Sequence, residues 1–82
     1  MNFTVYSKRL CPYCDRIKKV LEHLSGTRGF PVIIYELDTD FTRENFIAKF
    51  GEGASFPQVI VNSKKLGGCV NTIKYLQEQK LI

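Results

Sequence analysis

The stretch Cys11-Pro12-Tyr13-Cys14 places two cysteines three residues apart at the start of a predicted helix. Proline is tolerated at the first helical position, because the N–H that it lacks would have no partner there. The apolar residues that follow recur at i, i+3, i+4 and i+7 and predict an amphipathic helix from Pro12 to Leu24. Residues three apart on a first helical turn face the same side, within the roughly 4.4–6.8 Å between Cα atoms that a disulfide needs. The pattern therefore favours thiol–disulfide exchange.

The two cysteines are expected to differ in exposure and in role. Cys14 lies at the edge of the apolar stripe, whereas Cys11 lies at the open helix start, so we expect a sheltered Cys14 and an exposed Cys11. The free N–H groups and the dipole of the helix start, with Lys8 nearby, would stabilise a thiolate at Cys11. Cys11 is thus the predicted nucleophile and Cys14 the resolving thiol. Tyr13 projects from the same turn as a wall of a substrate groove.

The rest of the chain predicts one α/β domain over residues 1–82, in the order β-α-β-α-β-β-α. A strand before and a strand after the first helix imply a right-handed parallel crossover. The stretch Ser25–Gly29 is expected to break the first helix, and Asn62-Ser63-Lys64 is expected to form the turn of a hairpin. The predicted strands are 3–6, 32–37, 58–61 and 65–66, and the predicted later helices are about 42–50 and 70–79.

Three of these segments carry predictions about burial. The strand 32–37 is β-branched and mostly apolar, which is typical of a buried strand. The second helix is capped within Asp38–Thr42, ends at Gly51, and should turn three side chains inward: Phe46, Ile47 and Phe50. The last helix should do the same with Val70, Ile73 and Leu76.

Composition and charge exclude some functional classes. The net charge is +4, but the basic residues are dispersed and form no nucleic-acid-binding motif, so no nucleic-acid partner is expected. No apolar run approaches the roughly 20 residues that cross a bilayer, and no membrane partner is expected. The first residues also lack the layout of a signal peptide, so a reducing cytoplasm is the expected compartment.

A zinc site is the main alternative for the paired cysteines. Zinc needs about four ligands, and the remaining candidates are Cys69, His23 and acidic residues. His23 lies about 18 Å from Cys11 along a regular helix and on the face opposite the apolar stripe. It is therefore excluded both as a co-ligand and as a catalytic partner of Cys11, and no metal is expected.

Two further motifs widen the pattern: Ser55-Phe56-Pro57 before a predicted strand, and Gly67-Gly68-Cys69 before the last helix. Together with the cysteine motif and the order of elements, they closely resemble the glutaredoxin family over essentially the whole chain. The resemblance implies a thioredoxin fold, with a four-stranded mixed sheet flanked by three helices. It also implies a cis peptide bond before Pro57, with the backbone of Phe56 turned toward the substrate so that a cysteinyl peptide pairs with it.

The resemblance implies glutathione as co-substrate, with no permanently bound cofactor. Lys8 and Arg43 occupy positions that meet the glycine carboxylate of glutathione, and the helical angle of Arg43 places it toward the protein body. The alternative for Arg43 is a stem packed on the core with its head in water. After the glycine pair, Cys69 and Val70 would hold the γ-glutamyl carboxylate through their backbone N–H groups. The implied glutathione-binding set is Lys8, Tyr13, Arg43, Ser55, Phe56, Pro57, Gly68, Cys69, Val70 and Asn71.

Departures from the family pattern modify this expectation. Many glutaredoxins have Asp where this chain has Asn71, so the ionic partner of the substrate ammonium is replaced by a neutral acceptor. Phe56 replaces a smaller residue and is expected to put a bulky side chain beside the groove. We therefore predict that glutathione binding is retained but weaker than is typical. Cys69 is either a small buried hydrophobe or a regulatory thiol.

The predicted function is that of a dithiol glutaredoxin, which reduces protein disulfides and glutathione mixed disulfides and is re-reduced by glutathione. Ribonucleotide reductase is a client implied by the family alone, and a monomer is expected. Two alternatives stay open. One is a redoxin of the same fold that thioredoxin reductase reduces. The other is a module that holds an iron–sulfur cluster through Cys11 and glutathione, although Pro12 stiffens the loop against that use.

Overall fold

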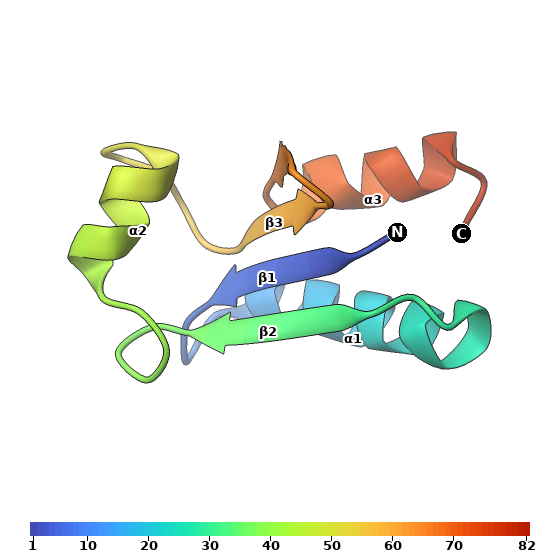
Figure 1. Ribbon diagram of the computed structural model, residues 1–82, viewed down its shortest axis with the longest axis horizontal. Coiled ribbons are helices and arrows are strands. Elements are labelled where there is room, and N and C mark those ends of the chain that lie inside the picture. The colour runs from blue at the N-terminus through green and yellow to red at the C-terminus, as the bar shows by residue number, and fades with distance from the viewer.

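Four strands and three helices follow one another along residues 1–82 of the computed structural model, in the predicted order β-α-β-α-β-β-α. The strands are β1 (Phe3–Ser7), β2 (Val32–Glu36), β3 (Gln58–Val61) and β4 (Lys64–Gly67). The helices are α1 (Pro12–Arg28), α2 (Arg43–Phe50) and α3 (Cys69–Glu78). The strands form one mixed sheet in the order β2-β1-β3-β4, in which only the β1–β2 pair is parallel (Figure 1). The predicted thioredoxin fold is confirmed.

The main core lies between the sheet and the two helices α1 and α3, which contact each other on one face of it. Alternate residues of the central strand β1 are buried there, beginning with Phe3 and Val5. Ile17 and Leu21 of α1 and Leu76 of α3 are fully buried against them. Burial of each such side chain contributes about 1.5–3 kcal/mol, so this layer holds the start of α1 firmly against the end of β1.

Helix α2 lies beyond the ends toward which β1 and β2 point, rather than over the main core (Figure 1). It begins at a capping box, in which the Thr42 hydroxyl accepts the Asn45 N–H at 3.1 Å. Aromatic rings attach it to the sheet: the Tyr6 ring lies 5.0 Å from that of Phe50. The prediction for Ile47 is wrong, because its side chain is 37% exposed. A helix packed on a small ring cluster buries a narrower stripe than one packed on a sheet.

Helix α1 is longer than predicted and continues through Gly26 to Arg28. A glycine inside a helix costs only about 1 kcal/mol, which does not end a helix whose other residues pack well. The end comes at Gly29, whose left-handed backbone (φ 74°) lets its N–H donate to the Ser25 carbonyl at 2.9 Å. The predicted break was placed one glycine too early.

Two predictions of buried apolar residues are also wrong. Strand β2 is an edge strand that pairs only with β1, and its Ile33 is 50% exposed. On α3, Leu76 is buried and Ile73 packs against the core as predicted, but Val70 is 72% exposed, and Cys69 and Thr72 complete the inward face. Both errors arise because an apolar residue does not reveal which neighbour, if any, will cover it.

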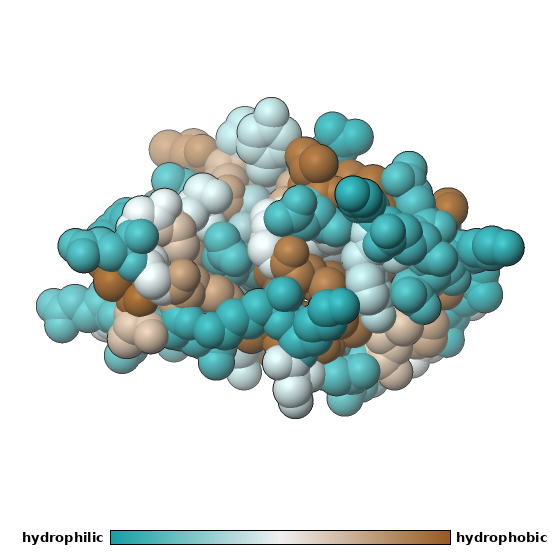
Figure 2. Space-filling model, turned by 90° about the horizontal axis from the view of Figure 1, so that it is seen from above, coloured by the Kyte–Doolittle hydropathy of each residue, from teal (hydrophilic) through white to brown (hydrophobic).

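The face of the molecule seen from above is mainly polar (Figure 2). Figure 2 shows hydrophilic side chains over most of the face seen from above, with hydrophobic side chains in small patches. None of the three helices combines the length and the apolar character that a membrane crossing requires.

Candidate functional site

A disulfide joins Cys11 and Cys14 at the start of α1, with their Cα atoms 5.2 Å apart, inside the predicted range. Cys11 is the N-cap of the helix: its backbone is extended, and its Sγ accepts the Cys14 N–H at 3.2 Å. A sulfur atom here occupies the position that a hydroxyl or carboxylate oxygen usually takes at an N-cap. Because a helix start carries partial positive charge, this position stabilises a thiolate at Cys11.

Both cysteines are buried, which corrects the prediction of an exposed Cys11. Its exposed fraction is 6%, against 0% for Cys14. The Cys11 sulfur folds back onto the first turn of α1, and the carbonyl oxygen of Phe56 lies 4.0 Å from it on the other side. The difference in exposure between the two cysteines is therefore smaller than predicted, although Cys11 is the one with some exposed surface.

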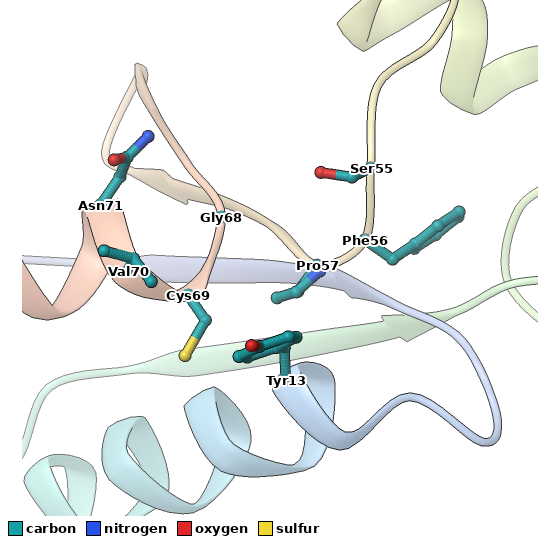
Figure 3. A pocket seen from close by; sticks show the side chains of 8 residues that line it. All are labelled: Tyr13, Ser55, Phe56, Pro57, Gly68, Cys69, Val70 and Asn71. Carbon is teal, nitrogen blue, oxygen red and sulfur yellow. The ribbon is translucent and has the colours of Figure 1, made fainter.

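A pocket of about 260 Å³ lies beside the disulfide, since its lining includes Tyr13, between the two cysteines, and Phe56, whose carbonyl is near the Cys11 sulfur. Figure 3 shows the side chains that line it. Three segments form it: the first turn of α1, the segment before β3 with its cis Phe56–Pro57 bond, and the start of α3. Every residue that lines it belongs to the set predicted from the sequence: Tyr13, Ser55, Phe56, Pro57, Gly68, Cys69, Val70 and Asn71. The fold thus brings the first turn of α1 together with two segments that lie more than 40 residues further along the chain.

The start of α3 contributes unoccupied backbone donors to this pocket. Gly68 is its N-cap, and no side chain caps the N–H groups of the first turn. The turn before it depends on Gly67, whose φ of 104° is unfavourable for other residues. A Cβ atom at Gly67 would also lie 2.6 Å from Nδ2 of Asn71. The glycine therefore lets the Asn71 side chain lie against the turn. The backbone N–H groups beside it, in the first turn of α3, can donate hydrogen bonds to an anion.

Phe56 has a different role from the one predicted. Its ring points away from the pocket in Figure 3, so it does not narrow the groove. The ring stacks on Phe46 of α2, with centroids 4.1 Å apart and planes 10° apart. On the same ring lies the Lys8 ammonium, 5.4 Å from the centroid. The aromatic contact thus joins α2, the segment before β3 and Lys8 into one unit beside the disulfide.

Arg43 is not among the residues that line the pocket. It is the first residue of α2, is exposed and forms no ion pair, so the prediction that it faces the protein body is wrong. The reason is the position of α2, which contacts the rest of the chain through Phe46 and Phe50.

Cys69 packs in the main core with an exposed fraction of 5%. Burial raises the pKa of its thiol, and the nearby positive charge of Arg16 opposes this shift only in part. The thiol therefore stays protonated and is a poor nucleophile near neutral pH. These facts favour the small buried hydrophobe over the regulatory thiol.

The most exposed large hydrophobic side chains gather around the disulfide. They are Leu10 at 94%, Val70 at 72% and Tyr13 at 59%. Exposed hydrophobic residues next to a reactive group are typical of a binding surface. No group of three or more His, Cys, Asp or Glu side chains is placed to hold a metal ion.

Sequence reasoning missed the aromatic residues behind Phe56. Four phenylalanines fall between positions 41 and 56, which is the only sign of the ring cluster in the sequence. The spacing alone does not show that these rings meet, since a helix and a loop separate them.

The geometry agrees with comparisons to known proteins. The glutaredoxin family model matches residues 3–66. The chain is 35% identical over 79 residues to glutaredoxin-C6 of Oryza sativa subsp. japonica, covering 95% of this chain and 69% of that protein. It is 34% identical over 71 residues to glutaredoxin 3 of Escherichia coli, covering 83% of this chain and 77% of that protein.

Solved structures give the same result. Reduced Escherichia coli glutaredoxin superposes with a TM-score of 0.84 and 25% identity over the whole of both chains. A buckwheat glutaredoxin–glutathione complex matches with a TM-score of 0.73 and 28% identity, over 96% of this chain and 71% of that one. The cysteine pair at the helix start, the fold and these relatives agree, and the chain belongs to the glutaredoxin family.

Proposed function

We propose that this chain is a glutathione-dependent thiol–disulfide oxidoreductase that reduces protein disulfides and glutathione mixed disulfides. The observation that carries the proposal is the Cys11–Cys14 disulfide, in which the Cys11 sulfur accepts the Cys14 N–H at the start of α1, next to a pocket. The buckwheat relative that was solved in complex with glutathione supports the same co-substrate here.

The reaction begins from the reduced pair. The Cys11 thiolate attacks one sulfur of the substrate disulfide, a new S–S bond forms, and the other sulfur leaves with the electron pair as a thiolate. With a protein disulfide, the Cys14 thiolate then attacks the Cys11 sulfur, which releases the reduced protein and leaves the Cys11–Cys14 disulfide. Two glutathione molecules restore the dithiol and are themselves joined as glutathione disulfide.

The walls of the pocket supply groups that fit glutathione. The cysteinyl part would pair with the backbone of Phe56, as an added strand does. One carboxylate would accept hydrogen bonds from the uncapped N–H groups at Cys69 and Val70. Lys8 does not line the pocket; its ammonium lies on the Phe56 ring, and a contact with the other carboxylate stays a prediction from the family resemblance. A role for Arg43 stays a prediction from the family resemblance.

Cysteine variants test the assignment of roles. Cys11→Ser should lose all activity, because no other reactive thiol lies at the pocket. Cys14→Ser should still reduce glutathionylated substrates, since glutathione can resolve that intermediate. Cys69→Ser tests the third cysteine: the backbone N–H proposed to bind the carboxylate is kept, so both activities should remain and show that the Cys69 thiol takes no part. Activity that survives in Cys11→Ser would overturn the proposal.

The choice of reductant separates this function from its closest rival. Turnover should be supported by glutathione with glutathione reductase, and not by thioredoxin reductase. The opposite result would indicate a redoxin of the same fold.

We further propose a cytoplasmic monomer, with ribonucleotide reductase as a client implied by the family resemblance. Clients can be trapped as mixed disulfides on Cys14→Ser and identified by mass spectrometry, and sedimentation gives the oligomeric state.

A further inference from the structure

A second groove adjoins the proposed site between α1 and α3. It has a volume of about 470 Å³, and its lining comes from Arg16 on α1 and from Cys69, Val70, Ile73, Lys74 and Gln77 on α3. Cys69 and Val70 also line the pocket beside the disulfide. A chain that reacts at Cys11 can therefore continue from the pocket into the groove.

The groove lining combines exposed apolar side chains with two cationic side chains. Val70 is 72% exposed and Ile73 is partly exposed, so both have surface to bury against a partner. Arg16 and Lys74 are exposed and neither forms an ion pair; the ion pair of this chain joins Lys18 and Asp15, 3.6 Å apart. No acidic side chain lines the groove. Its charge is thus complementary to an acidic ligand.

The length of the groove defines the size of that ligand. From Val70 to Gln77 the helix rises about 10 Å at 1.5 Å per residue. An extended peptide covers this length with about three residues at 3.3 Å each. Glutathione is proposed to bind at the pocket and near Lys8, neither of which belongs to the groove lining except through Cys69 and Val70, so the groove would be used by longer chains.

We propose that this groove binds the segment of a protein substrate that flanks its reacting cysteine, and that it selects segments with an apolar residue and acidic residues within about five positions of the cysteine. The apolar side chain lies on Val70 and Ile73, and the carboxylates meet Arg16 and Lys74. This inference rests on the proposed function and names the class of protein substrate for the same site.

The test uses the full chain with three substrates. Two are glutathionylated peptides with one leucine near the cysteine, one carrying two glutamates and the other two lysines at the same positions. The third is the mixed disulfide of glutathione and 2-mercaptoethanol, which is too small to reach the groove. The unmodified chain should prefer the acidic peptide, and the preference should shrink as salt is raised, because the cations are exposed.

The double variant Arg16→Glu, Lys74→Glu should lose about tenfold or more in kcat/KM for the acidic peptide, since each exposed contact changes from attraction to repulsion. Its kcat/KM for the small substrate should stay within about twofold, because no groove contact is involved. The matched control, Lys19→Glu with Lys80→Glu, changes the net charge equally at residues outside the groove lining. It should leave the preference for the acidic peptide nearly unchanged.

Three results would overturn the inference: equal loss in the control, equal loss for the small substrate, or no preference in the unmodified chain. An Arg16→Ala, Lys74→Ala variant avoids introduced repulsion, and it too must lose the preference for the acidic peptide. Failure of the proposed function looks different, since the unmodified chain would then reduce none of the three substrates.

Discussion

Replacing Phe46 by leucine should weaken both the fold and substrate binding. Phe46 is 2% exposed, and its ring contacts those of Phe56, Phe50 and Phe41 at centroid distances of 4.1, 5.0 and 5.9 Å. Three such ring contacts at about 0.5–1.5 kcal/mol each contribute about 1.5–4.5 kcal/mol to stability, in addition to the free energy from burying apolar surface. Leucine keeps much of the apolar area and recovers some contact, so we expect a loss of about 1–3 kcal/mol in unfolding free energy.

The same variant should raise KM for a glutathione mixed disulfide more than it lowers kcat. The reason is that Phe46 supports the ring of Phe56, whose carbonyl lies 4.0 Å from the Cys11 sulfur. Urea unfolding followed by circular dichroism gives the free energy, and steady-state kinetics give KM and kcat. Phe30→Leu is the control, because Phe30 makes one ring contact, with Phe3 at 6.2 Å. A stability loss no larger than that of Phe30→Leu, or an unchanged KM, would refute the reasoning.

Three further predictions concern α3 and its turn. In a Cys14→Ser background, Asn71→Asp should favour the exchange in which glutathione disulfide forms a mixed disulfide with Cys11 and releases one glutathione, because the carboxylate adds a charge beside the pocket. Calorimetry measures this equilibrium, and an unchanged equilibrium constant would count against a role for this side chain. Gly67→Ala should lower the unfolding free energy, measured in urea, by about 1–3 kcal/mol, since φ is 104° and the new Cβ meets Asn71. Gly26→Ala is the control: this glycine lies inside α1 with open space around it, so the change should raise the unfolding free energy by about 0.5–1 kcal/mol. Burial raises the pKa of Cys69 in the folded chain, so its contribution to stability is present below the unfolded thiol pKa of roughly 8.5 and is lost as pH rises through the folded value. The unfolding free energy should therefore decrease less between pH 7 and pH 10 in Cys69→Ala than in the unmodified chain. An equal decrease in both would contradict a raised pKa of the Cys69 thiol.

Local signals in the sequence were sufficient for the order of elements and for the chemistry. Pro12 at the first helical position makes Cys11 the N-cap of α1, and the spacing of three brings Cys14 within disulfide distance. Both features depend on a single turn of backbone. The glycines at 67 and 68 and the proline at 57 likewise mark turns that few other residues could form. These motifs carried the resemblance to the glutaredoxin family, and that resemblance implied all eight residues that line the pocket.

Tertiary structure alone decided what covers each surface. The sequence could not show that the Phe56 ring turns away from the pocket onto Phe46, or that Arg43 is exposed. Nor could it show that Val70 stays exposed where it lines both the pocket and the groove. It also could not show that Cys11 is buried, because the covering carbonyl belongs to Phe56, 45 residues away. Backbone conformation follows from neighbours in the chain, whereas burial depends on segments that meet only after folding. The reactive motif was therefore determined by the sequence, and its surroundings by the packing of distant segments around it.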